Sequence, residues 1–188
     1  MVKKHSLSIL DAAEEVVSIL KQHRIDAIVI GAVALAAHHY IRQTEDVDLG
    51  INANVRAMRA VRQSLQELGF TAEFREPDGE DPLGGVIDVS GSFGLVQIIS
   101  FADRFPDVID DALRACTTAL RENSGLKLVP IPQLVALKLY AGGYKSKADI
   151  VELLRHNPDV DIDALRAVCV KYRLRGLEPL IREARLSV

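Results

Sequence analysis

The sequence predicts an α/β fold with a mixed β-sheet in about residues 1–130, followed by a small helical part in about 131–188. In the first part, short runs rich in valine and isoleucine alternate with segments whose apolar residues recur at helical spacing. Some neighbouring runs are separated by a helix and others by a hairpin turn, which predicts parallel and antiparallel strands in one sheet. From Pro132 onward nearly every segment has helical periodicity, so we expect helices that pack on the α/β part.

The elements up to residue 70 follow from apolar patterns and turn residues. The patterns predict a helix over 7–23, a buried strand over 27–30 that ends at a glycine, a short helix over 33–41, and a strand over 46–51. A strong helix follows, because Asn54 can cap it and Gly69 can end it. Its predicted buried stripe consists of Val55, Met58, Val61, Leu65 and Leu68.

The remaining elements follow in the same way. We expect a strand over 71–76, a loop rich in turn residues over 77–85, and a hairpin over 86–101 that turns at about 91–94. A helix over 107–116 and a short strand over 126–131 complete the first part. The predicted helices of the second part cover 132–143, 146–157, 161–174 and 176–186.

Composition narrows the class of protein. The 188 residues suit one domain, or one domain with a helical appendage, and 48% of them are hydrophobic, enough for a real core. A formal net charge of −3 excludes a global basic field for long nucleic acid and leaves a local basic patch open. Cys116 and Cys169 lack CxxC spacing, which favours reduced thiols over a disulfide or a zinc site. With no secretory pattern and no stretch near the ~20 apolar residues of a membrane helix, we expect a cytoplasmic protein.

Two aspartates in "RQTEDVDLGI" suggest a metal site. Asp46 and Asp48 lie two residues apart on a predicted strand, so their side chains share one face of the sheet. Two close carboxylates repel each other, and a divalent cation relieves that cost. Mg²⁺ prefers one or two carboxylates together with the phosphates of a nucleotide. The alternative is an exposed strand edge or a turn in which one aspartate caps the next helix, which is the commoner meaning of an isolated DxD pattern.

A phosphate-binding turn is predicted just before this pair. The segment "VIGAVALAA" runs from a strand into Gly31, and a helix starts at once. This geometry directs free backbone N–H groups and the positive end of the helix dipole beyond the strand, where a phosphate can bind. Strand–glycine–helix turns are common in α/β proteins, so this feature alone carries little weight.

In combination, these features resemble the nucleotidyltransferase superfamily, which has the polymerase-beta-like fold. The resemblance is closest to bacterial nucleotidyltransferases of the type IV toxin–antitoxin, or abortive-infection, kind. It is carried by "GAVALAAHHYIRQTEDVDLGI", "DPLGGVI" and "VPIPQLVALKLYAGGYKSKADIVELL", which span about residues 28–155.

The resemblance implies a role for each matching residue. Asp46 and Asp48 would hold Mg²⁺ or Mn²⁺, and Gly31 would start the phosphate-facing turn. Ala32 stands where the family usually has glycine or serine. The residues implied at the border of the nucleotide, near its triphosphate and at the rim of the site are Arg42, Thr44, Lys138, Lys145 and Asp149. Without the resemblance, Lys138 is better explained as a solvated residue on an apolar helix.

The third carboxylate of such sites has no obvious counterpart. Family members usually carry it on a later strand, as base or as ligand to a second metal ion. The matching strand is "LVQIISF", in which Gln97 and Ile99 share a face and neither is acidic. Asp88 on the preceding strand is the nearest substitute as a metal ligand, and Asp103 lies just beyond the strand.

Two functions therefore remain open. The first is a metal-dependent nucleotidyltransferase that binds a nucleoside triphosphate and passes the nucleotide monophosphate to a tRNA 3′ end or a protein side chain. The second is a catalytically degenerate protein that binds a nucleotide or a partner. In either case an antitoxin-like protein is a candidate partner for the helical part. His38 and His39 are interpreted as satisfied or exposed histidines, and the arginines at 56, 59 and 62 as a solvated face, with a nucleic-acid-binding stripe as the alternative.

Overall fold

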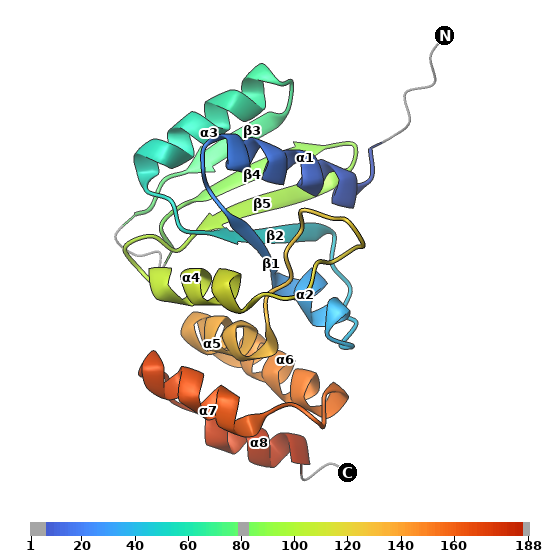
Figure 1. The fold of residues 1–188 in the computed structure, drawn as a ribbon, viewed down its shortest axis with the longest axis vertical. Coiled ribbons are helices and arrows are strands. Elements are labelled where there is room, and N and C mark those ends of the chain that lie inside the picture. Colours follow the sequence, from blue (N-terminus) through green and yellow to red (C-terminus); the bar gives the residue numbers. More distant parts are fainter. Residues whose placement is uncertain (1–6, 79–82, 186–188) are drawn as a thin grey trace.

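The computed structural model describes residues 7–78 and 83–185. A five-stranded sheet lies between two groups of helices, with α1 and α3 on one side and α2, α4 and the C-terminal helices on the other (Figure 1). Residues 79–82 of the loop predicted over 77–85, residues 81–82 of "DPLGGVI", and residue 186 of the last predicted helix lie outside the described residues. No helix within 7–78 and 83–185 has the length and apolar character that crossing a membrane requires.

The mixed sheet is confirmed. Its strands are β1 (Ala27–Ile30), β2 (Asp46–Ile51), β3 (Thr71–Arg75), β4 (Val86–Gly91) and β5 (Gly94–Ser100), in the spatial order β1-β2-β5-β4-β3. Only β2 and β5 run parallel, and the other neighbours are antiparallel. The predicted hairpin at 91–94 produces the antiparallel pair β4–β5. The helix between β1 and β2 joins an antiparallel pair as well, and the parallel partner of β2 is β5, which follows only after another helix and two more strands.

The helices of the α/β part are α1 (Ile9–Gln22), α2 (Gly31–Ala37), α3 (Val55–Glu67) and α4 (Pro106–Ala115). Asn54 caps α3 as predicted, since its side chain accepts a hydrogen bond of 2.9 Å from the Ala57 amide. The predicted stripe is wrong at Leu68, whose surface is 64% exposed. The helix ends at Glu67, and Gly69, with φ +90°, turns the chain away, so Leu68 never faces the sheet.

Two further boundaries differ from the prediction. The helix expected over 33–41 ends at Ala37, because His39 adopts a left-handed φ of 68°. The strand expected over 126–131 forms only isolated bridges, from Leu128 to Val29 and from Lys127 to Ala119. Pro130 has no amide hydrogen, so the pairing beside β1 cannot continue.

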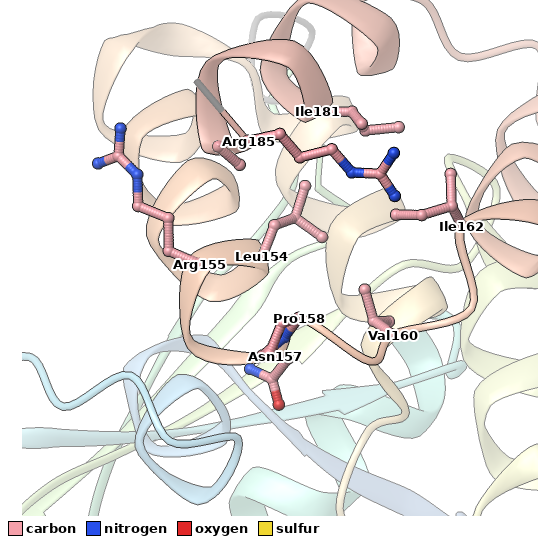
Figure 2. Close-up of a pocket in the computed structure, with 9 residues that line it drawn as sticks. Leu154, Arg155, Asn157, Pro158, Val160, Ile162, Ile181 and Arg185 are labelled. Atoms are coloured by element: carbon pink, nitrogen blue, oxygen red, sulfur yellow. The ribbon is translucent and has the colours of Figure 1, made fainter. Parts of the chain in front are cut away.

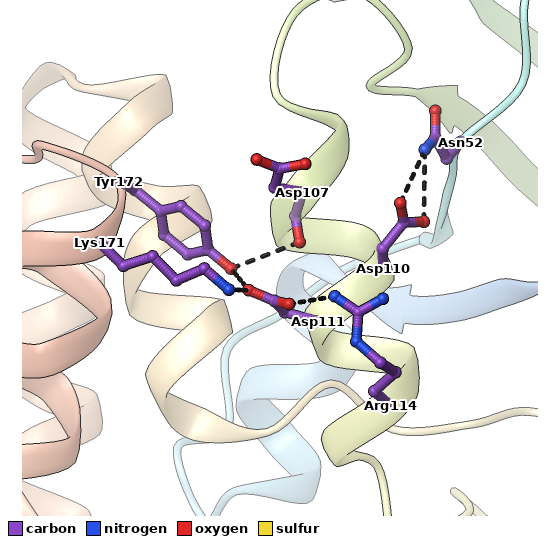
Figure 3. Close-up of polar contacts among 7 residues, drawn as sticks. All are labelled: Asn52, Asp107, Asp110, Asp111, Arg114, Lys171 and Tyr172. Atoms are coloured by element: carbon purple, nitrogen blue, oxygen red, sulfur yellow. Dashed lines mark hydrogen bonds and ion pairs between the residues drawn. The ribbon is translucent and has the colours of Figure 1, made fainter.

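The C-terminal helices are α5 (Ile131–Ala141), α6 (Gly143–His156), α7 (Ile162–Lys171) and α8 (Leu177–Arg185). The helix α5 is buried from Gln133 to Leu137 and contacts α4, α6 and α7, so it connects the sheet side to the outer helices. Figure 3 shows a polar cluster that joins α4 to α7: the Asp111 carboxylate accepts from Lys171 and Tyr172, and also from Arg114 on its own helix. Burial raises the pKa of Asp111, but the hydrogen bonds have the larger combined effect and lower this pKa to about 2.

Candidate active site

The aspartate pair projects from the face of the sheet on which α2 and α4 lie. Along β2, Val47 and Leu49 point to the other face, where α1 and α3 bury them almost completely. Asp46 and Asp48 are half-buried on the opposite face. Val47 and Leu49 are therefore core residues. The carboxylates of Asp46 and Asp48 lie together beside α2, as their two-residue spacing predicts.

Asp48 lies directly against Gly31. A Cβ atom added to Gly31 would stand 1.8 Å from Oδ2 of Asp48, so no other residue fits at position 31 while Asp48 keeps this place. The φ of Gly31 is +68°, a conformation that glycine adopts without strain. The chain thus turns from β1 into α2 at a glycine, and the absence of a side chain lets the carboxylate approach the backbone this closely. Ala32 follows and is buried.

Asp46 has a hydrogen-bond partner in the segment that precedes it. The Thr44 hydroxyl donates to Oδ1 of Asp46 and lies 3.4 Å from the Asp46 carbonyl oxygen. This contact orients the carboxylate from the outer edge of the site. The position of Thr44 at the border of a bound nucleotide stays a prediction.

A buried ion cluster lies beside the aspartate pair. Asp149 on α6 is 4% exposed and accepts a hydrogen bond of 2.7 Å from Nζ of Lys138 on α5. Arg42, in the segment before β2, lies 3.8 Å from the same Asp149 oxygen. Asp149 therefore holds two cations in place by its own charge, and Lys138 is not the solvated residue that its apolar helix suggested.

The electrostatics of Asp48 connect these groups. Burial and the neighbouring Asp46 raise the pKa of Asp48 to about 6, and Lys138, Arg42 and the exposed Lys145 act against this rise. The three cations that the family resemblance implied therefore all direct their field at Asp48. A carboxylate pair with this excess of negative charge, backed by Gly31, fits a divalent cation in its donor chemistry and its charge.

Gln97 occupies the strand position between Asp48 and Asp88. In the sheet register Asp48 lies opposite Gln97 on β5, and Gln97 lies opposite Asp88 on β4. Asp88 accepts a hydrogen bond of 2.6 Å from Nε2 of Gln97 and pairs with Nε of Arg75 at 2.9 Å. Its carboxylate is thus turned toward an amide and a guanidinium, one strand further from Asp48 than Gln97 is.

No group of three or more His, Cys, Asp or Glu side chains suited to a metal ion occurs within the part of the chain that the structure describes. Ile99 lies opposite Gly50, and Asp103 is exposed in the turn after β5 with a left-handed φ of 62°. The strand that should carry a third acid therefore presents an amide to the site.

The other candidates have structural roles. His38 and the Val129 carbonyl are 2.7 Å apart, with Nε2 as the donor, and burial lowers the pKa of this imidazole. Arg59 is exposed and pairs with Glu76 at 2.7 Å, consistent with a solvated face on α3.

Two pockets were not predicted. One, of about 270 Å³, lies between the sheet and α5 and is bordered by Gly31 and Lys138. The other, of about 220 Å³, lies in the C-terminal helices among Leu154, Ile162 and Ile181 (Figure 2). Each pocket is closed by residues from distant parts of the sequence, so no local pattern indicates that a space remains there.

The fold of the chain is the nucleotidyltransferase-like α/β fold: a mixed five-stranded sheet with helices, followed by a helical part. The antibiotic-resistance factor ANT(2″)-Ia is similar over 87% of this chain and 90% of its own, with a TM-score of 0.55 and 12% identity. An antigenic nucleotidyltransferase-like protein from Paracoccidioides brasiliensis matches over 95% and 94%, with a TM-score of 0.52 and 17% identity.

JHP933 from Helicobacter pylori covers 99% of this chain and 93% of its own, with a TM-score of 0.50 and 14% identity. Neither a protein-family model nor a curated protein matches the sequence. At these identities the likeness shows the fold alone, and function has to be argued from the site itself.

Proposed function

We propose that the protein binds a nucleoside triphosphate together with Mg²⁺ or Mn²⁺ at Asp46 and Asp48. The observation that carries this proposal is the placement of the Asp48 carboxylate against Gly31, beside Asp46 and within the field of three cations. A structural pair of surface aspartates needs neither the close approach to glycine nor the surrounding positive charge.

Each residue has a role in this proposal. Asp46 and Asp48 would hold the metal ion, with Thr44 orienting Asp46. The turn at Gly31 and Ala32 leaves room for a phosphate beside the backbone. Lys138 and Lys145 would balance phosphate charge, and Asp149 keeps Lys138 and Arg42 in position.

The reaction that such a site performs is transfer of a nucleotide monophosphate. An acceptor oxygen bonds to the α-phosphorus, the bond from that phosphorus to the bridging oxygen breaks, and pyrophosphate leaves while the acceptor proton passes to solvent. The bound metal ion supplies charge neutralisation at the phosphates. The acceptors implied by the resemblance are a tRNA 3′ end and a protein side chain.

Gln97 favours a second candidate function, binding of the nucleotide without efficient transfer. A positioned base contributes roughly 10²–10⁴-fold to a rate, and an amide at this place cannot accept the proton. In this case the bound nucleotide regulates contact with a partner such as an antitoxin-like protein on the helical part. Purification of the protein with its natively co-expressed neighbours tests for that partner.

Calorimetric titration of Mg-ATP and Mg-CTP into wild type, Asp46→Asn and Asp48→Asn tests the binding proposal. We expect wild type to bind at least one nucleotide, and each variant to lose about tenfold or more in affinity, since a ligand carboxylate is removed. Equal affinities, or no binding to any of the three, would refute it. Incubation with α-labelled nucleotide, followed by analysis of RNA and protein, then separates transfer from binding alone.

A further inference from the structure

The 270 Å³ pocket beside Gly31 has apolar walls on both sides. Ile99 and Phe101 line it from the sheet side, and Leu134 and Leu137 line it from α5. Its volume is near the lower end of the range of small-molecule sites, about 300–1,000 Å³. A molecule with one or two rings fits such a space, whereas a folded macromolecule does not.

This pocket adjoins the proposed nucleotide site. Gly31 lines the pocket, and the same residue lies against Oδ2 of Asp48. Lys138 also lines the pocket while its field reaches Asp48. A molecule in the pocket therefore lies next to the groups that would hold the metal ion and the phosphates.

The charges around the pocket favour an uncharged occupant. Lys138 is the only charged side chain among its described lining residues, and this ammonium already donates to Asp149 at 2.7 Å. No acidic side chain of the described residues lines the pocket, so a polycation finds no partner there. The uncharged polar groups of the lining are the hydroxyls of Tyr140 and Ser146, and a hydroxyl both donates and accepts hydrogen bonds.

The same charges disfavour RNA. A strand of RNA is held by free cations along its phosphates. Lys138, the one cation among the described lining residues, donates to Asp149, Arg42 faces the same carboxylate, and the whole chain carries a formal charge of −3.

We propose that this pocket binds an uncharged small molecule with one or two rings, as the second ligand of the nucleotide site. The pairing of the two ligands rests on the proposed function, but binding in the pocket does not require transfer. Gly31 borders both sites, so a ligand in one site affects binding in the other. By thermodynamic linkage, each ligand changes the affinity for the other by the same factor.

Methyl NMR with 2-naphthol as the probe tests the proposal. We expect saturable shifts of the Ile99, Leu134 and Leu137 methyl signals, and a dissociation constant that changes at least threefold when Mg-ATP is present. Ile99→Phe fills the pocket and should weaken 2-naphthol binding tenfold or more. Leu95→Phe is the matched control, since Leu95 is half-buried on the same strand and face but does not line the pocket.

Unchanged affinity in Ile99→Phe, or equal losses in both variants, would overturn the proposal. Thermal unfolding of each variant verifies that it folds. Salt-dependent binding of labelled single-stranded RNA that 2-naphthol displaces would also overturn it, in favour of a nucleic-acid ligand. Wild type that binds 2-naphthol but no Mg-nucleotide would refute the proposed function and the pairing of ligands, whereas wild type that binds only Mg-nucleotide would refute the pocket alone.

Discussion

Oδ2 of Asp48 lies 1.8 Å from the place where a Cβ atom on residue 31 would stand. Any residue other than glycine at position 31 would therefore push the Asp48 carboxylate away. The strand and the helix start are thereby fixed relative to each other. The glycine has a steric purpose here as well as a conformational one, since its φ is +68°. Substitutions can separate these two purposes.

We expect Gly31→Ala to weaken Mg-ATP binding tenfold or more, because the new methyl group displaces the Asp48 carboxylate. Because alanine is strained at a positive φ, the substitution should also lower the free energy of unfolding by about 1–2 kcal/mol. Calorimetric titration measures the first effect and urea unfolding the second.

Gly69→Ala is the matched control for this prediction. Gly69 also has a positive φ, of +90°, but a Cβ there would meet nothing within 4 Å. The control should lose a similar amount of stability and keep its affinity for Mg-ATP. If both variants lose affinity equally, the contact between Gly31 and Asp48 is irrelevant to binding.

Metal-free protein should become more stable when Asp48 is replaced by asparagine. The pKa of Asp48 is raised from 3.8 to about 6, chiefly by burial, so ionised Asp48 destabilises the folded state at neutral pH. A raised carboxyl pKa means that wild type gains stability as the pH falls from above 6 toward 4. Asp48→Asn should therefore be about 1–3 kcal/mol more stable than wild type at pH 7.5, and this advantage should vanish near pH 4.

Thermal unfolding in the presence of a chelator measures that difference, and Mg-ATP should reverse its sign, since only wild type gains binding energy. A variant that is less stable than wild type at pH 7.5 without metal would contradict the burial of an unbalanced charge at this position.

The sequence predicted the sheet and the aspartate pair because both depend on short-range patterns. Alternation places Asp46 and Asp48 on one face whatever the rest of the chain does. The strand–glycine turn and the hairpin at 91–94 are equally local, and the structure has both. The domain boundary near residue 130 and the catalytic roles of individual residues stay predictions.

Features that depend on distant residues could not be predicted in this way. Leu68 fits the helical stripe, yet the helix ends one residue before it. The ion cluster brings Arg42, Lys138 and Asp149 together from three separate segments, and only the family resemblance pointed to them. The pairing of Asp88 with Arg75 requires knowledge of strand register, which a pattern of single residues does not contain.

Gln97→Asp should increase nucleotide transfer relative to wild type. The new carboxylate stands beside Asp48 in the strand register and restores a third acid. A positioned base contributes roughly 10²–10⁴-fold, so a gain of tenfold or more is expected in an assay with α-labelled nucleotide. Gln97→Asn is the control: it shortens the side chain equally and adds no carboxylate. If neither variant gains activity, the third acid is not what limits transfer.

Removing the charge of Asp149 should destabilise the protein. This carboxylate is 4% exposed, and its loss leaves Lys138 unpaired in a poorly solvated place. We expect Asp149→Asn to cost about 3 kcal/mol, and Asp149→Asn with Lys138→Met to recover most of it, because the unpaired cation is then gone. Urea unfolding of the two single variants and the double variant yields the coupling energy. Additive losses would show that the pair is not coupled.

The cluster that joins α4 to α7 should stabilise the fold through the charge of Asp111. Asp111 has a pKa lowered to about 2, because hydrogen bonds from Lys171, Tyr172 and Arg114 outweigh its burial. A lowered carboxyl pKa stabilises the fold above the unfolded value of 3.8, and this contribution is lost as the pH falls toward 2. Since Lys171 and Arg114 are largely exposed, solvent screens the pairs, and Asp111→Asn should cost about 1–2 kcal/mol at pH 7.

The matched control is Asp163→Asn, which removes the same charge from a carboxylate with a 90% exposed side chain. This pair lies in solvent and should contribute little to the free energy of unfolding. Urea unfolding between pH 7 and pH 2.5 should show the Asp111 variant approaching wild type in acid, while the control stays close to wild type throughout. A loss in Asp111→Asn that persists at pH 2.5 would mean that side-chain shape rather than charge holds α7 against α4.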